Sequence, residues 1–233
     1  HVPFLLRCLA LVLVILVLAR PQTTNKWQNS EIEGIDIMLA IDVSTSMLAE
    51  DLKPNRLEAA KDVAAEFING RPNDNIGITL FAGETFTQCP LTVDHAVLLD
   101  MIHNIKCGLI TDGTAVGMGI ANAVTRLKDS KAKSKVIILL TDGTNNKGDI
   151  SPMTAAEIAK SFGIRVYTIG VGTNGMAPYP YPVGNTVQYV SMPVEIDEKT
   201  LTEIAGTTDG NYFRATSNSK LKEVYEEIDK LEK

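Results

Sequence analysis

Five oxygen-bearing side chains stand out in this chain for their types and spacing. Asp42, Ser44 and Ser46 lie two residues apart, directly after an apolar run that ends at Ile41. Because successive side chains in extended backbone point to opposite sides, the oxygens of these three residues can converge on one point. Oxygen ligands of this kind suit a hard cation.

Thr114 and Asp142 complete the set. Thr114 lies in a loop that is expected to open a helix, and Asp142 follows a second apolar run, just before Gly143. In open α/β sheets, ligands bind outside the carboxyl ends of strands, where the strand order reverses. If the strands that end near Asp42 and Asp142 are neighbours, two carboxylates and three hydroxyls meet there. With waters they form an octahedral oxygen shell that suits Mg²⁺, with Mn²⁺ in competition.

Each of these residues also has a more ordinary explanation. Ser44, Ser46 and Thr114 are of the types that cap helices or stabilise turns. Asp142 precedes a glycine, and this pair is common in turns. The joint placement favours a metal site, because the Asp-x-Ser-x-Ser triplet, the threonine and the second aspartate all fall on the same predicted face.

The elements that must position these residues alternate between strand and helix, as in a parallel sheet with helices on both faces. Strands are predicted at residues 35–41, 76–82, 136–140, 165–171 and 211–214. A short antiparallel edge strand is expected at residues 85–88, because only Gly83 and Glu84 separate it from the strand before it. Helices are predicted at residues 56–69, 94–104, 115–127, 154–162, 201–205 and 221–231.

A long excursion, residues 173–194, follows the strand at 165–171 and is rich in Pro and Tyr. Because it leaves the carboxyl end of a strand, we expect it to overhang the metal face; a surface hairpin packed on itself is the alternative. Gly170 begins a Gly-x-Gly-x-x-Gly sequence, but the prolines that follow cannot form the helix that a dinucleotide site requires. Candidate interface residues on the excursion are Tyr179, Tyr181, Pro182 and Tyr189.

The N-terminus is a nearly unbroken apolar run from Val2 to Ala19. A helix of about eighteen residues spans roughly 27 Å, which is sufficient for a thin bilayer core. We therefore expect a membrane anchor at residues 1–20, a linker at 21–33 and one globular domain at 34–233. A signal peptide is the alternative for the first segment, and basic residues on both sides of it leave its orientation open.

The composition excludes some classes of function. The net charge is −6 and the Lys residues are scattered among acids, which argues against a nucleic-acid-binding surface. The 233 residues suffice for one sizeable core rather than two full domains. Cys8, Cys89 and Cys107 lack the spacing of a zinc site or a disulfide scaffold, although Cys89 and Cys107 could pair in an oxidising compartment.

Together these residues resemble the metal-ion-dependent adhesion site of von Willebrand factor A domains, and the resemblance covers roughly residues 35–231. It implies a Rossmann-like three-layer α/β fold. The sheet would be mainly parallel and six-stranded, in the order 3-2-1-4-5-6, with a short antiparallel edge strand and helices on both faces. The resemblance also implies that a divalent cation, Mg²⁺ or else Mn²⁺ or Ca²⁺, is held by Asp42, Ser44, Ser46, Thr114 and Asp142.

Within that family, residues 47–57, 81–91 and 112–115 are similar to the BatA-type proteins of bacterial aerotolerance operons. This similarity implies a protein anchored in the bacterial inner membrane with its domain in the periplasm. As partners it implies other von Willebrand factor A proteins of the same operon and a MoxR-type AAA+ ATPase. Members of the group usually carry a further membrane helix after the domain, so the chain is expected to continue beyond Lys233.

The expected activity is capture of a protein partner and not catalysis. A cation held mainly by neutral hydroxyls keeps an electrophilic position, which an Asp or Glu of a partner can fill. Residues 48–55 and 145–152, with the excursion, are candidates for the rim that gives specificity. One alternative is a Mg²⁺-dependent hydrolase like the haloacid-dehalogenase phosphatases, but this needs a second acid two residues after Asp42, where the chain has Ser44. The other alternative is a scaffold whose metal is purely structural.

Overall fold

The computed structural model describes residues 34–142, 144–184 and 186–232, together with 2–4, 6–7 and 10–11. The chain divides into two compact units, residues 1–32 and 33–233. The predicted anchor and linker fall mostly outside the described residues. None of the helices in the described part of the chain combines the length and the hydropathy that crossing a bilayer requires.

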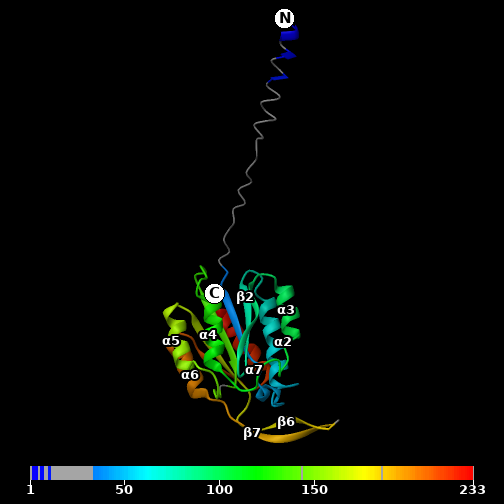
Figure 1. The fold of residues 1–233 in the computed structure, drawn as a ribbon, viewed down its shortest axis with the longest axis vertical. Coiled ribbons are helices and arrows are strands. Elements are labelled where there is room, and N and C mark those ends of the chain that lie inside the picture. Colours follow the sequence, from blue (N-terminus) through cyan, green and yellow to red (C-terminus); the bar gives the residue numbers. More distant parts are fainter. Residues whose placement is uncertain are drawn as a thin grey trace. The chain divides into compact units, whose positions relative to one another are not determined.

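The main sheet is built from β1 (Asp36–Asp42), β2 (Asn75–Phe81), β3 (Thr85–Thr92), β4 (Lys135–Thr141), β5 (Arg165–Val171) and β8 (Tyr212–Ala215). The strands lie in the order β3-β2-β1-β4-β5-β8 (Figure 1). Neighbouring strands are parallel except β2 and β3. The expected order 3-2-1-4-5-6 and the antiparallel edge strand are therefore confirmed. The edge strand β3 is longer than predicted and continues past residue 88 to Thr92.

The helices of the domain are α2 (Arg56–Asn69), α3 (His95–His103), α4 (Val116–Leu127), α5 (Pro152–Ser161), α6 (Glu198–Thr207) and α7 (Asn218–Leu231). One face of the sheet is covered by α2, α3 and α7, and the other by α4, α5 and α6 (Figure 1). Side-chain caps mark most helix starts, since polar oxygens there accept backbone N–H groups that lack a partner within the helix. The capping residues are Asn55, Asp94, Ser151, Asp197 and Ser217.

The central strand β1 is apolar on both sides because helices cover both faces of the sheet. Ile37 and Leu39 pack in the cluster with α2, α3 and α7, whereas Met38 and Ala40 pack in the cluster with α4, α5 and α6. This double burial explains why the strand reads as a continuous apolar run and not as an alternating one.

The arrangement of β1 and β4 positions the predicted site. The two strands are parallel neighbours, with Ile41 opposite Leu140. Asp42 ends β1 and Asp142 follows β4 directly, so both aspartates leave the sheet at the same edge. The condition on which the five-residue prediction depended is therefore met.

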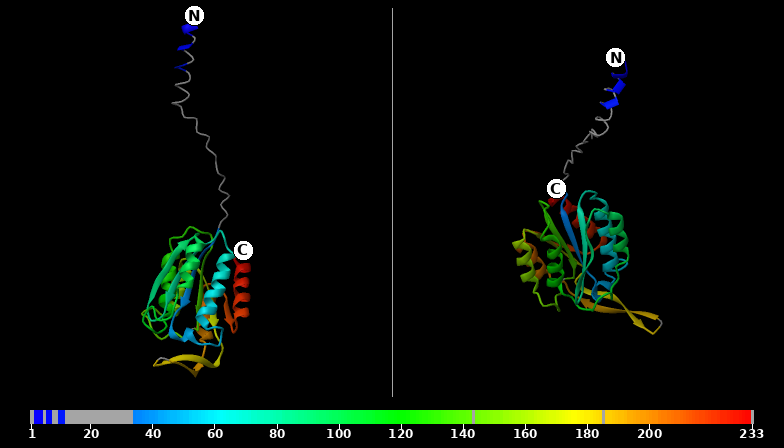
Figure 2. Two further views of the ribbon diagram at one scale, coloured as in Figure 1. Left: turned by 90° about the vertical axis from the view of Figure 1, so that its right-hand side faces the viewer. Right: turned by 45° about the horizontal axis from the view of Figure 1, so that its top comes forward.

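Residues 173–194 contain a regular β-hairpin. Its strands β6 (Gly175–Val183) and β7 (Thr186–Val194) form an antiparallel sheet of their own. The hairpin extends from the end of the domain at which the parallel strands have their carboxyl ends (Figure 2). The Gly-x-Gly-x-x-Gly sequence leads into β6 and not into a helix, which confirms that it does not form a dinucleotide-binding turn.

Candidate metal centre

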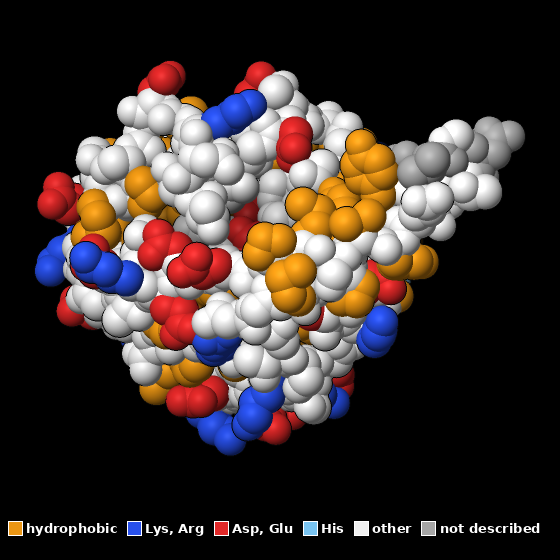
Figure 3. Space-filling view, turned by 90° about the horizontal axis from the view of Figure 1, so that it is seen from below, with side chains coloured by type: hydrophobic (Ala, Val, Ile, Leu, Met, Phe, Trp, Pro, Cys, Tyr) orange, Lys and Arg blue, Asp and Glu red, His pale blue; other side chains and the backbone are white. Residues whose placement is uncertain are grey.

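A cavity of about 260 Å³ lies at the carboxyl ends of β1 and β4. Four of the five predicted site residues line it, and the end of the hairpin adds a further wall at residues 193–195. Figure 3 views the domain from this end, where acidic side chains gather beside hydrophobic ones that lie toward the hairpin. The lining site residues are Ser44, Ser46, Thr114 and Asp142.

The two serines lie at a short 3₁₀ helix, η1 (Thr45–Leu48). Ser44 occupies the position before this helix, yet its side chain accepts no capping hydrogen bond. Instead, Ser44 Oγ and Ser46 Oγ are 3.0 Å apart. The helix-cap explanation for Ser44 is therefore excluded, and the two hydroxyls form a pair of oxygens at the cavity wall.

Thr114 is held by the loop after β4. The cap position of α4 is Ala115, which has no capping side chain. Asn145 Oδ1 accepts the N–H of Val116 at 2.9 Å, and Asn146 Oδ1 accepts the N–H of Thr114 at 2.9 Å. The loop supplies the caps that the helix lacks, so the hydroxyl of Thr114 is not the cap of α4.

Asp112 joins the loop of the serines to the loop of Thr114. The backbone N–H and the hydroxyl of Thr45 donate to its two carboxylate oxygens at 3.0 and 2.9 Å. Although partial burial acts to raise it, the hydrogen bonds from Thr45 hold the pKa of Asp112 below its ordinary value. Asp112 therefore stays ionised and fixes the two loops against each other.

Asp142 has one oxygen engaged and one without a donor. Its Oδ2 lies 3.4 Å from Nη1 of Arg56. Its Oδ1 is buried and has no hydrogen-bond partner among the described residues. Buried carboxylate oxygens are nearly always satisfied, so this oxygen indicates a group that the chain itself does not supply.

Asp42 lies behind the cavity wall and is fully buried. Its Oδ1 accepts the backbone N–H of Ser44 at 2.9 Å, and its Oδ2 accepts the hydroxyl of Thr141 at 2.6 Å. Burial, with the nearby negative charge of Asp142, raises the pKa of Asp42 to about 7. Asp42 thus shapes the serine loop and, above its raised pKa, adds negative charge behind it.

Arg56 belongs to the site, although the sequence did not lead us to it. The side chain is fully buried and pairs with both oxygens of Asp51, at 2.8 and 2.7 Å, as well as with Asp142. Asp51 in turn accepts the N–H of Thr173, at the base of the hairpin, at 2.7 Å. Gly172 has φ +127°, and a Cβ there would lie 2.4 Å from Arg56, so glycine leaves room for the guanidinium.

A signal for Arg56 was present in the sequence. Arg56 precedes Ala60, Ala64 and Phe67 at helical spacing, so it lies on the apolar stripe of α2 and not on its polar face. A charged residue on a buried stripe needs buried partners. The prediction missed it because an arginine in the first turn of a helix is usually solvated.

One of the two described cysteines, Cys107, contacts the serine loop. Cys89 and Cys107 are both unpaired, and Cys107 Sγ donates to the carbonyl of Ser44 at 3.4 Å. Burial, with the charges of Asp42 and Asp112, raises the pKa of Cys107 to about 12. Cys107 is therefore a neutral thiol that supports the serine loop.

The donor set fits a divalent cation with oxygen ligands. One cavity is lined by two serines whose hydroxyls are 3.0 Å apart, by a buried threonine and by Asp142, whose Oδ1 has no donor among the residues that the structure describes. These are hard donors, which suit Mg²⁺ or Mn²⁺. No group of three or more His, Cys, Asp or Glu side chains in the described residues is arranged to hold a metal ion, so this site is distinguished by its hydroxyls.

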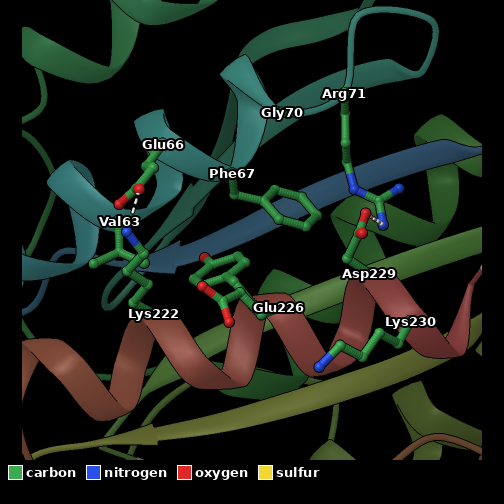
Figure 4. Close-up of a pocket in the computed structure, with 10 residues that line it drawn as sticks. Val63, Glu66, Phe67, Gly70, Arg71, Lys222, Glu226, Asp229 and Lys230 are labelled. Atoms are coloured by element: carbon green, nitrogen blue, oxygen red, sulfur yellow. Dashed lines mark hydrogen bonds and ion pairs between the residues drawn. The ribbon is translucent and has the colours of Figure 1, made fainter.

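A second cavity, of about 380 Å³, lies between α2 and α7 and contains none of the predicted site residues. Figure 4 shows Phe67 between the two helices, with charged side chains paired across them. Arg71 pairs with Asp229 at 2.8 Å, and Lys222 pairs with Glu66. We interpret this cavity as a seam between packed helices, because these two ion pairs already join the helices across it.

The comparisons with known proteins agree with this geometry. The model of the von Willebrand factor type A domain matches residues 36–227. A UPF0353 protein of Mycolicibacterium paratuberculosis is 32% identical over 241 residues, which cover 97% of this chain and 68% of the relative. An uncharacterised protein of Borreliella burgdorferi is 29% identical, and the match covers 66% of its length. This chain therefore spans about two thirds of the length of these relatives.

Two solved structures indicate more narrowly which proteins of the family this chain resembles. An aerotolerance-related membrane protein from Bacteroides fragilis is 34% identical, with a TM-score of 0.74, and the match covers 84% of this chain and all of the other. BatB from Bacteroides thetaiotaomicron is 35% identical, with a TM-score of 0.76, and the match covers 84% and 98%. The expected similarity to aerotolerance proteins is confirmed, although the name on the solved neighbour is BatB and not BatA.

A more distant solved structure contains a metal in a metal-ion-dependent adhesion site. Proximal thread matrix protein 1 from the mussel byssus, with a zinc-occupied metal-ion-dependent adhesion site, is 25% identical, with a TM-score of 0.66. The match covers 85% of this chain and 45% of that protein. With the family model, the strand order and the site geometry in agreement, this chain belongs to the von Willebrand factor type A domain family.

Proposed function

We propose that this domain binds a divalent cation and uses it to capture a protein partner through an Asp or Glu side chain. The observation that carries the proposal concerns Asp142, which lines a cavity together with three hydroxyl-bearing residues. Its Oδ1 is a buried carboxylate oxygen for which the described part of the chain supplies no donor. The zinc-occupied site of the mussel protein supports a metal at this place in the fold.

The side chains have separate roles in this proposal. Ser44, Ser46, Thr114 and Asp142 would hold the cation, and Asp42 would orient the serine loop and contribute charge from behind. When bound, Mg²⁺ supplies an electrophilic position that a carboxylate can occupy. Arg56, which also lines the cavity, neutralises part of the negative charge of Asp142 through its contact with Oδ2.

A hydrolase fits these residues less well. A haloacid-dehalogenase-like mechanism needs a nucleophilic aspartate and a second acid two residues later. Asp42 is fully buried with both oxygens hydrogen-bonded, and the residue two positions later is Ser44. We therefore propose binding without turnover. The structural-scaffold alternative differs in predicting that partner binding is insensitive to removal of the metal.

The setting is also part of the proposal. The Bacteroides fragilis neighbour is described as an aerotolerance-related membrane protein. We propose that residues 1–20 anchor this chain in a bacterial inner membrane and that the domain faces the periplasm. The partners would then be other von Willebrand factor A proteins of the same operon and a MoxR-type ATPase.

Calorimetric titration with Mg²⁺ and with Mn²⁺ tests the metal site. We expect the chain to bind one cation, and we expect Asp142→Ala and the double variant Ser44→Ala/Ser46→Ala to lose this binding. Asp149→Ala is the matched control, because Asp149 is an exposed aspartate in the loop after β4. Retention of full affinity in Asp142→Ala would refute the assignment of the site.

A further inference from the structure

The hairpin β6–β7 is unusual in having no charged residue between positions 175 and 194. Every described position of β7 before Val194 is exposed. Val187, Tyr189, Val190 and Met192 are 43–62% exposed. Strand edges in soluble proteins are usually protected by charges, prolines, bulges or covering elements, and an unprotected edge accepts another strand.

The outer edge of β6 is protected. Prolines at 178, 180 and 182 occupy alternate positions, so their backbone groups point toward the same edge of the hairpin. That direction is away from β7, because the carbonyl of Pro178 accepts the N–H of Glu50 at 2.9 Å. Proline has no N–H to offer, so this edge lacks donors at three successive outward positions, and another strand cannot pair with it.

The outer edge of β7 is open. Ser191 lies opposite Pro178, and Tyr189 lies opposite Pro180. In an antiparallel pair, residues opposite an outward-facing position also direct their N–H and C=O groups outward. The outward set on β7 is therefore Val187, Tyr189 and Ser191, ending at Pro193, and no hydrogen bond to the backbone of the first three is found within the described part of the chain.

The open edge leads to the metal cavity. Pro193 and Val194 line that cavity and also a neighbouring groove of about 280 Å³ beneath the hairpin. The groove shares Thr45 and Ser46 with the cavity, and the rest of its wall is mostly apolar, with Ala177 among its residues. A strand paired with β7 would thus be guided toward the hydroxyls of the candidate site.

We propose that the partner docks as a third strand on the outer edge of β7. Its chemistry follows from the edge: an extended, uncharged segment with alternating apolar side chains, followed by an Asp or Glu at the end near Pro193. Main-chain hydrogen bonds to Val187, Tyr189 and Ser191 supply affinity, and the cavity selects the carboxylate. The carboxylate part rests on the proposed metal-dependent function, whereas the strand-addition part does not.

A display library of random twelve-residue peptides, selected against the chain with Mg²⁺ present, provides the probe. We expect enriched peptides to combine uncharged alternating residues with one acid. Ser191→Pro removes one outward N–H and should weaken their binding about tenfold, as measured by fluorescence anisotropy. Ser191→Ala removes the same hydroxyl but keeps the N–H, and it should bind like the unmodified chain.

Val187→Pro and Val187→Ala form a second matched pair and guard against a folding defect at one position. Proline is compatible with outward positions of β7, since Pro193 already occupies one. No enriched peptide, or equal binding by the proline and alanine variants, would overturn strand addition. Light scattering that shows a dimer dissolved by Ser191→Pro would also overturn it, because a second copy would then occupy the edge. Proline-sensitive binding that persists in Asp142→Ala would support the edge and refute the metal-dependent function.

Discussion

Asp42 and Asp142 are the two carboxyl groups behind and beside the cavity, and their surroundings differ. Asp42 is fully buried and has donors for both oxygens, whereas Asp142 pairs with Arg56 on one side only. Two buried carboxylates near one another are costly without a cation between them. The ionisation of Asp42 and the binding of a cation should therefore be linked.

The pH dependence of stability follows from this linkage. The pKa of Asp42 is raised to about 7 in the folded metal-free chain, above its ordinary value of 3.8. The folded state then holds a proton that the unfolded state has lost, so stability falls by up to about 1.4 kcal/mol per pH unit between these two values. Thermal melting without metal should show this loss between pH 4 and pH 7.

Asp42→Asn is the matched variant for this prediction, because the amide does not titrate. The difference in melting temperature between the two chains should change across this pH range and level off above pH 7. Mg²⁺ should stabilise the unmodified chain more at pH 8 than at pH 5, because protons compete with the cation. A difference that is constant with pH would contradict a raised pKa for Asp42.

Arg56 gives a second prediction. Arg56→Met leaves Asp51 and Asp142 buried without their cationic partner, and such a loss costs about 3–5 kcal/mol of folding stability. Urea unfolding measures this cost, and saturating Mg²⁺ should restore part of it. Lys53→Met is the control at an exposed cation, expected to stay within about 0.5 kcal/mol of the unmodified chain. If Arg56→Met changed the stability as little as Lys53→Met does, the ion pairs of Arg56 would not hold the site together.

The loop after β4 acts at the level of elements, because it caps α4 and holds Thr114. Asn145→Ala removes the acceptor for the N–H of Val116 and should cost about 1 kcal/mol of stability. Calorimetry should also show weaker Mg²⁺ binding, because the start of α4 carries Thr114. Asn69→Ala changes an exposed helix-end asparagine at the end of α2 opposite the one that carries Arg56, and it should leave Mg²⁺ affinity unchanged. If Asn145→Ala bound Mg²⁺ with unchanged affinity, the cap of α4 would not contribute to the metal site.

The alternation of strands and helices could be predicted because each apolar run has the period of its element and most helix starts carry a capping residue. The bounds of α2 and β5 agree with the prediction. α6 and α7 began earlier than expected, at Glu198 and Asn218, since their first turns are polar and add nothing to an apolar pattern. Local periodicity thus predicted which helices and strands form but not the polar residues at which some helices begin.

The candidate site was predicted only in part. Ser44, Ser46, Thr114 and Asp142 share a cavity as expected, because the ends of neighbouring parallel strands meet. The position of Asp42 behind the cavity wall depends on the hydroxyl of Thr141 on the neighbouring strand. Arg56 acts through Asp142, 86 residues away along the chain, and Asn145 acts through Val116, 29 residues away. Spacing along one segment contains no information on such partners.

At the scale of the whole domain, the candidate metal site and the hairpin lie at the same end of the sheet (Figure 2). Asp51 connects them, since it binds both Arg56 beside the cavity and Thr173 at the base of the hairpin. Residues at the end of the hairpin line the cavity wall, so a group bound in the cavity would lie beside them. The face therefore combines the candidate metal site with an uncharged strand edge.

Anomalous diffraction from crystals of the chain soaked in Mn²⁺ tests the central claim most directly. We predict one anomalous peak in the cavity at the ends of β1 and β4, within bonding distance of the hydroxyls of Ser44 and Ser46 and of Oδ1 of Asp142. Crystals of Asp142→Ala should lack this peak, and those of Asp149→Ala should retain it. A cavity without a peak at saturating Mn²⁺, or a peak that survives in Asp142→Ala, would contradict a metal centre at these residues.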